Sequence, residues 1–160
     1  MRLRHVLLSG AIVATTGAMA LGGSVSAGRT AVGIESFSSV QDISGNGGGP
    51  VTASGVINAH GTDTVVSATE DTFDFGAQGK ITVFHSPLSN VQHVNQKQCT
   101  FSFTERGVYV FGNGTGAWAN YSGSGKYTVQ GNATNACGDS PVGTVTITAS
   151  GPISPLSTDN

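Results

Sequence analysis

The sequence predicts an all-β protein, a single antiparallel β-barrel of about eight strands. The first observation is composition, because charged residues make up 10% of the 160 residues, well below the share of about a quarter in average proteins. The second is the regular return of short segments rich in β-branched and aromatic residues, separated by turn residues, with no competing helical period. Closure into a barrel removes exposed sheet edges. A β-sandwich of the same strands is the alternative.

The first 27 residues have the parts of a secretory signal peptide. Two arginines give a basic start, residues 6–21 are apolar or small, and Ala27 is preceded by the short side chains that cleavage requires. A membrane anchor is the alternative, but a Thr-Thr-Gly sequence interrupts a run that is already short for spanning. We therefore expect a secreted, extracellular protein whose mature chain begins near Gly28.

Charge argues against two classes of partner. The formal net charge is −2, and removal of the two leader arginines leaves five basic against nine acidic residues, a charge near −4. A nucleic-acid-binding protein gathers its basic residues into a patch. No such cluster occurs here, and four of the five, Lys80, Lys97, Arg106 and Lys126, are scattered along the chain. We expect no nucleic-acid partner, no anionic membrane surface as partner and no membrane span after signal removal, and the oligomeric state stays open.

The mature chain is expected to form one domain. Residues 28–50 form a partly flexible N-terminal segment, in which residues 32–43 give a first strand and the Gly-rich run 45–50 a break. The barrel covers residues 51–151, and residues 152–160 form a loose C-terminal tail. The further strands are predicted at residues 51–59, 63–68, 72–75, 80–85, 98–106, 108–111, 126–130 and 144–149, with breaks at 60–61, 76–79, 87–90 and 131–141.

Cys99 and Cys137 are the only cysteines. In an exported chain two cysteines most often pair, and the bond closes a loop of about 38 residues, worth about 4 kcal/mol in the chain-entropy model. It ties the strand at 98–106 to the loop at 132–139. A catalytic cysteine is the alternative, and no activating group lies near either cysteine in the sequence.

Alternation along residues 98–106 identifies candidate ligand-lining residues. One face carries Cys99, Phe101, Phe103 and Glu105, and the other carries hydroxyl residues and Arg106, which is typical of a half-buried strand. In residues 80–85 the same reasoning places His85 on the apolar face.

Two interpretations of Glu105 and His85 follow. In the first, both point into the barrel, where they form an acid–base pair or bind a polar ligand group, and an apolar lumen raises the pKa of the carboxyl group. In the second, both lie at strand ends where the lumen opens to water, and residues 105–107 form a turn or bulge that breaks the alternation. Gly107 leaves the facing of Tyr109 and Phe111 unassigned.

No motif predicts a metal or a cofactor. Glu70, Asp71 and Asp74 lack the spacing of a calcium loop, and their segment predicts a solvated strand face. The histidines lack zinc spacing, and neither a phosphate-binding loop nor a nucleophile elbow occurs.

The segment 106–129 organises the chain: two aromatic-bearing strands enclose a Gly-rich stretch. Glycines at such density favour tight corners. The order Gly-x-Gly-Thr-Gly, aromatic, Ser-Gly-x-Gly, aromatic resembles the corner of the allene oxide cyclase-like and dirigent-like β-barrel proteins, in a form similar to secreted actinobacterial relatives. The matching residues are Gly112, Gly114, Thr115, Gly116, Trp118, Gly123, Gly125 and Tyr127.

The resemblance implies a barrel that binds or guides a small apolar or aromatic molecule without a cofactor. Dirigent-like proteins steer the coupling of phenoxy radicals generated elsewhere, and allene oxide cyclases close a bound epoxide. A non-enzymatic binding protein is therefore the first hypothesis and an isomerase or cyclase the second. A solidly packed structural protein of the cell envelope is the third. The functional residues of these families do not map onto this chain beyond the glycine corner.

Overall fold

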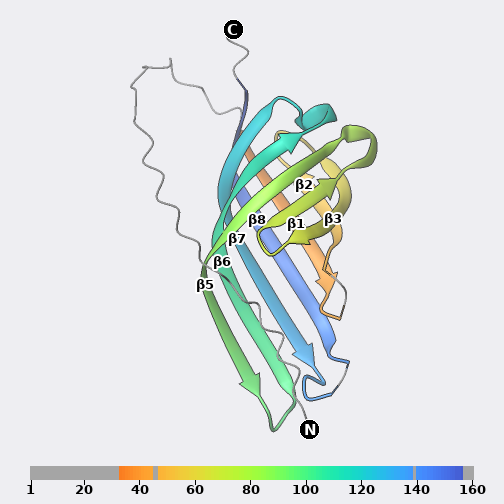
Figure 1. Ribbon diagram of the computed structural model, residues 1–160, viewed down its shortest axis with the longest axis vertical. Coiled ribbons are helices and arrows are strands. Elements are labelled where there is room, and N and C mark those ends of the chain that lie inside the picture. Colours follow the sequence, from red (N-terminus) through yellow and green to blue (C-terminus); the bar gives the residue numbers. More distant parts are fainter. Residues whose placement is uncertain (1–32, 45–46, 139, 157–160) are drawn as a thin grey trace.

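The computed structural model describes residues 33–44, 47–138 and 140–156, so the expected leader at 1–27 lies outside the described residues. Eight antiparallel strands form one closed barrel in which each strand pairs with the next in sequence and β8 closes on β1 (Figure 1). The prediction of an eight-stranded barrel is confirmed. The strands are β1 (Gly33–Asp42), β2 (Gly49–Ser54), β3 (Ala59–Ser67), β4 (Glu70–Asp74), β5 (Lys80–Asn95), β6 (Thr100–Gly114), β7 (Tyr121–Thr134) and β8 (Val142–Pro155).

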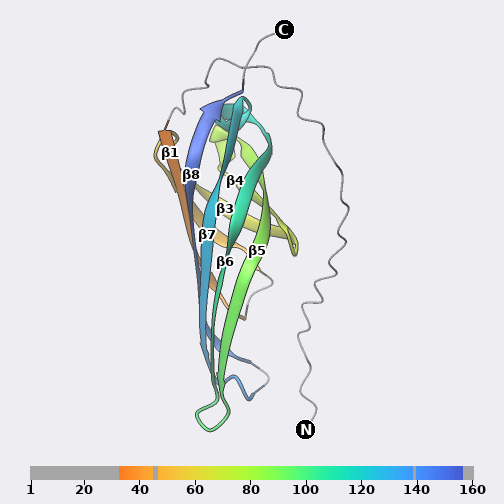
Figure 2. The ribbon, with the colours of Figure 1, turned by 90° about the vertical axis from the view of Figure 1, so that its left-hand side faces the viewer.

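The barrel has a closed end and an open sheet. β2, β3 and β4 have 6, 9 and 5 residues, whereas β5 to β8 have 14 to 16. The pairing of β4 with β5 begins at Lys80 and ends at Phe84, so from Ser86 onward β5 pairs with β6 alone. We call the far halves of β5 to β8 the open sheet, which Figure 2 shows as a thin single layer below the barrel.

Aromatic side chains fill the closed end. Phe37 packs against Phe73, Tyr109, Phe111 and Trp118, with ring centroids 5.4 to 6.3 Å apart. Trp118 is fully buried in the 3₁₀ turn η2 (Gly116–Trp118) and closes this end together with η1 (Gly76–Gln78). Such a filled interior is what a barrel of eight strands is wide enough to hold.

Only one of the five glycines highlighted by the sequence needs a left-handed backbone. That residue is Gly116, with φ +60°. Gly123 and Gly125 lie within β7, where an added Cβ would lie 2.6 and 2.7 Å from the rings of Phe111 and Tyr109 on β6. The expectation that the whole set marks tight corners was therefore wrong, because most of these glycines make room for a neighbouring group.

The long strands also correct several predicted boundaries. The segments 98–106 and 108–111 are one strand, β6, and the break expected at 87–90 is part of β5. Pro87 is tolerated there because it precedes a bulge, between Pro87 and Ser89, on a strand with one free edge. β8 continues to Pro155 rather than ending in a tail at residue 152, since Ile153 is fully buried in the core.

The first two predicted strands had different outcomes. A strand was expected within 32–43, and β1 occupies Gly33–Asp42, so much of the segment 28–50 belongs to the barrel. The strand expected at 51–59 is confirmed only in its first part, because β2 ends at Ser54 and residues 55–58 form the turn between β2 and β3.

The disulfide prediction is confirmed. Cys99 and Cys137 are joined, with Cα atoms 5.1 Å apart. Cys99 immediately precedes β6, and Cys137 lies in the loop between β7 and β8. The bond therefore links the β5–β6 hairpin to the β7–β8 hairpin at the tip of the open sheet.

Candidate functional site

The inner face of β6 continues without interruption past Gly107. Gly107 and Tyr109 are buried while Arg106, Val108 and Val110 are exposed, and Glu105 receives a hydrogen bond from the buried Tyr127. The turn or bulge suggested for residues 105–107 is wrong, because the bulge lies in β5 instead. Tyr109 and Phe111, whose facing the sequence left open, both pack on Phe37 inside the barrel.

Glu105 and His85 both face the interior, but they do not bond to each other. His85 Nε2 lies 3.2 Å from Asp71 Oδ2. Glu105 accepts hydrogen bonds from the Tyr127 hydroxyl at 2.9 Å and from Asn90 Nδ2 at 3.1 Å. The rings of His85 and Tyr127 meet edge to face at 5.5 Å. The two predicted residues therefore belong to one neighbourhood, each with its own partner.

Two further residues complete this group of polar side chains. Asp63 on β3 is 2% exposed, and its Oδ2 accepts a hydrogen bond of 2.7 Å from Gln41 Nε2 on β1. Gln41 Oε1 accepts the N–H of Gly48 at 3.2 Å, which fixes the amide orientation. We call the whole set the polar cluster: Gln41, Asp63, Asp71, His85, Glu105 and Tyr127.

Burial and mutual charge shift the pKa values in the polar cluster. Burial, reinforced by the charge of Asp71, raises the pKa of Asp63 to about 7, although the hydrogen bond from Gln41 opposes this. The hydrogen bond with Asp71 raises the pKa of His85 against the opposing effect of burial. Burial and the bond to Glu105 raise the pKa of Tyr127, so its hydroxyl stays a donor. Asp63 thus titrates near neutrality, as a general acid or base must.

Two buried atoms of the polar cluster lack a protein partner. These are Asp63 Oδ1 and His85 Nδ1. Most buried polar atoms are hydrogen-bonded, and each exception calls for an explanation such as a catalytic or binding role. Glu35 Oε1 and Trp118 Nε1 also lack partners, but neither residue belongs to the polar cluster. Glu35 is fully buried, and its other oxygen accepts the N–H of Ile57 at 2.9 Å and so holds the β2–β3 turn.

An apolar surface adjoins the polar cluster on the open sheet. Phe101 and Phe103 are partly buried, with ring centroids 5.7 Å apart. Val129 and Ile147 lie on the same face, because Glu105 pairs with Val129 and Val129 with Ile147. The predicted ligand-lining residues Phe101 and Phe103 therefore lie beside Glu105 along β6.

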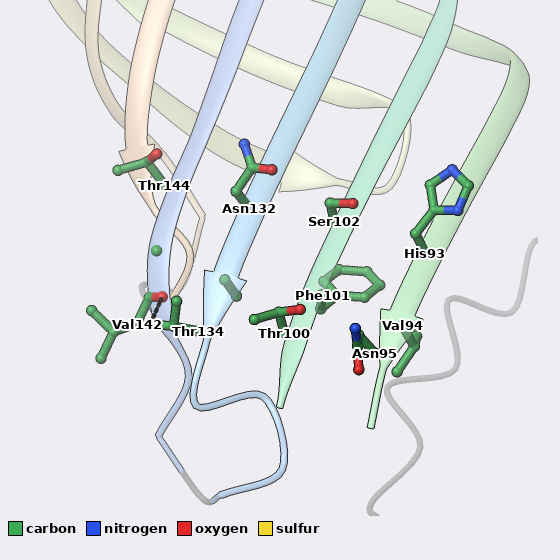
Figure 3. Close-up of a pocket in the computed structure, with 12 residues that line it drawn as sticks. His93, Val94, Asn95, Thr100, Phe101, Ser102, Asn132, Thr134, Val142 and Thr144 are labelled. Carbon is green, nitrogen blue, oxygen red and sulfur yellow. Dashed lines mark hydrogen bonds between the residues drawn. The ribbon is translucent and has the colours of Figure 1, made fainter. Parts of the chain in front are cut away.

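A separate hollow of about 570 Å³ lies at the tip of the open sheet (Figure 3). His93, Ser102, Asn132 and Thr144 form one cross-strand row through it, and most of its side chains are exposed. It shares Phe101 with the apolar surface but contains none of the polar cluster. His93 is its one titratable lining residue, so it has fewer groups for acid–base chemistry or polar binding than the polar cluster has.

The sequence did not identify Asp63, Asp71, Gln41 or Tyr127 as site residues. Asp71 was expected on a solvated face with Glu70 and Asp74, which is wrong because its side chain is 16% exposed and faces His85. Asp74 does lie outside, paired with Lys80. The alternation of Asp71 with Phe73, which is buried, was the available signal.

The described residues contain no group of three or more His, Cys, Asp or Glu side chains placed to hold a metal ion. Nor does any described helix have the length and hydrophobicity to span a membrane.

Comparisons of the chain with protein-family models, with curated proteins and with solved structures find no match. The resemblance to the allene oxide cyclase-like and dirigent-like proteins therefore stays a prediction, and the site has to be interpreted from its own chemistry.

Proposed function

We propose that the protein binds a small molecule at the junction of the barrel and the open sheet. The apolar or aromatic body of the ligand rests on Phe101 and Phe103, and its polar group reaches the polar cluster. The observation that carries this proposal is the pair of unpartnered atoms, Asp63 Oδ1 and His85 Nδ1, next to a partly exposed apolar face. Ligand sites combine these two features: an apolar lining and a few convergent polar groups.

The packed closed end limits where such a ligand goes. Phe37, Tyr109 and Trp118 occupy the interior there and are each at most 4% exposed. A ligand is therefore excluded from that half of the barrel and approaches from the side of the open sheet, and Asp71 and His85 at the junction keep 16% and 20% side-chain exposure. The structural-protein hypothesis fits the closed end but leaves the polar cluster without a purpose.

An isomerase or cyclase is the second candidate, and one observation favours it. Asp71 holds His85 through Nε2 and leaves Nδ1 unpartnered, the arrangement of a base oriented by a carboxylate. His85 can then accept a proton at Nδ1 while Asp63 donates one. Under this candidate His85→Asn abolishes turnover of an unsaturated epoxide but leaves ligand binding intact, and equal loss of both would contradict it.

We also propose that the protein is exported. The sequence of residues 1–27 supports it, and the Cys99–Cys137 disulfide is compatible with an oxidising compartment.

Fluorescence of the neutral probe N-phenyl-1-naphthylamine tests the binding proposal. We expect saturable binding to the wild type and a loss of at least tenfold in affinity, about 1.4 kcal/mol, in Phe101→Ser. Val110→Ser is the matched control, since Val110 lies on the outer face of the same strand and is 50% exposed. Equal binding by the three proteins, or no saturable binding by the wild type, would contradict the proposal.

A further inference from the structure

The interior of the barrel carries carboxylates without a matching set of basic residues. Asp63, Asp71 and Glu105 converge in the polar cluster, and His85 is the single basic group among them. Within residues 33–44, 47–138 and 140–156 every lysine and arginine is exposed, namely Lys80, Lys97, Arg106 and Lys126. Even with His85 protonated, the charge of the cluster is negative once its carboxyl groups are ionised.

Asp63 gives an independent indication that a donor is missing. Its carboxyl group is almost completely buried, at 2% residue exposure, and one oxygen accepts from Gln41 while the other has no partner. A buried carboxylate is costly unless it is paired or hydrogen-bonded. A neutral hydrocarbon would leave this cost in place and an anion would increase it, whereas a cation that donates a hydrogen bond or supplies positive charge removes it.

The surroundings also suit an organic cation rather than a bare ion. Tyr127 lies against His85, and Phe103 lies on the face that leads to the cluster. Faces of aromatic rings attract ammonium groups, and groups of aromatic rings are the known binding sites of quaternary ammonium ligands. Two oxygens of Glu105 are already bonded by Tyr127 and Asn90, which keeps that carboxylate fixed while Asp63 offers the free acceptor.

We infer that the ligand of this site is a small organic cation, an amine or quaternary ammonium group carried on an apolar or aromatic body. The cationic group lies among Asp63, Asp71 and Glu105, and the body rests on Phe101 and Phe103. This inference rests on the proposed binding function and names its ligand class. Binding is driven by charge complementarity inside a low-dielectric site, where a single pairing is worth more than on the surface.

Calorimetric titration with three probes of similar size tests the inference. These are phenyltrimethylammonium, its neutral analogue tert-butylbenzene, and the anion benzenesulfonate, each measured at about pH 8, above the pKa of Asp63. We expect the cation to bind at least tenfold more tightly than the neutral analogue, a difference of about 1.4 kcal/mol, and the anion to bind more weakly than both.

Charge-removing variants locate the effect. Asp63→Asn and Glu105→Gln should each reduce the preference for the cation, whereas Asp74→Asn, which removes one carboxylate from the outer face beside Lys80, should keep it. Thermal unfolding shows whether Asp63→Asn folds. If it does not, the binding preference of Glu105→Gln still tests the inference. Equal binding of the cation and the neutral analogue, or an equal loss in Asp74→Asn, would overturn the cation inference and leave the proposed function standing. Failure of all three probes to bind would overturn both.

Discussion

Asp63 should make the protein less stable as the pH rises from about 4 to about 7. Its pKa moves from an ordinary 3.8 to about 7 in the folded protein, mainly through burial. Between these values the folded state holds the proton more tightly than the unfolded state, so the free energy of unfolding falls as the pH rises. A shift of about three units at 1.36 kcal/mol each gives a loss of about 4 kcal/mol, complete above about pH 7.

Asp63→Asn isolates this contribution, because the amide has the shape of the carboxyl group and does not titrate. The groups that face Asp63 are Gln41 on β1, Asp71 on β4 and His85 on β5. The pKa of His85 is also raised, so its contribution to the free energy of unfolding also falls as the pH rises. His85 is present in both proteins. The difference between wild type and variant therefore reports Asp63 together with its charge interaction with His85.

Urea unfolding with the disulfide intact measures the effect, using the fluorescence of the fully buried Trp118. We expect the wild type to lose stability relative to Asp63→Asn across the range from about pH 4 to about pH 8, by a large share of the 5 to 15 kcal/mol typical of a domain. Two curves that run parallel over this range would refute the assignment of a raised pKa to Asp63.

The remaining predictions concern the backbone, the disulfide and the leader. Gly116→Ala should cost about 2 kcal/mol or more and exceed Gly76→Ala, since both have φ near +60° but an added Cβ meets a carbonyl oxygen at 2.6 Å only at Gly116; equal losses in thermal unfolding would show that the contact is unimportant. Replacing Cys99 and Cys137 together with serine should lower the unfolding free energy by about 4 kcal/mol, and an unchanged urea midpoint would contradict this. Mass spectrometry of the exported protein should find a chain that starts near Gly28, and an intact leader on the mature product would refute the export proposal.

The barrel was predictable because its signals are local. Alternation in 98–106 placed Phe101, Phe103 and Glu105 on one face, and the Gly-rich run after residue 44 marked the first turn. Strand lengths were not predictable in the same way, since residues 87–90 include Pro87, Ser89 and Asn90, which are typical turn residues. Their place in β5 depends on the bulge and on the absence of a second neighbouring strand.

Only part of the site was predictable from the sequence. His85 and Glu105 were placed on apolar faces from their own strands, without knowledge of which residues lie opposite. Asp63 belongs to the site because β3 and β1 bring it to Gln41, and this contact spans 22 residues of sequence. Asp71 reaches His85 only across the β4–β5 pairing, so neither carboxylate could be assigned before the strands were paired.

The position of the Cys99–Cys137 bond has a mechanical consequence. The ends of the four long strands lie beyond the reach of β2 to β4 and have no second layer behind them (Figure 2). β6 and β7 are paired out to Phe101 and Ala133, and the disulfide lies just beyond the last of these pairs. The crosslink therefore prevents the tips of the two hairpins from separating where the pairing ends. The covalent link therefore preserves the curvature of the surface on which Phe101 and Phe103 lie, at the place where backbone pairing alone has the least support.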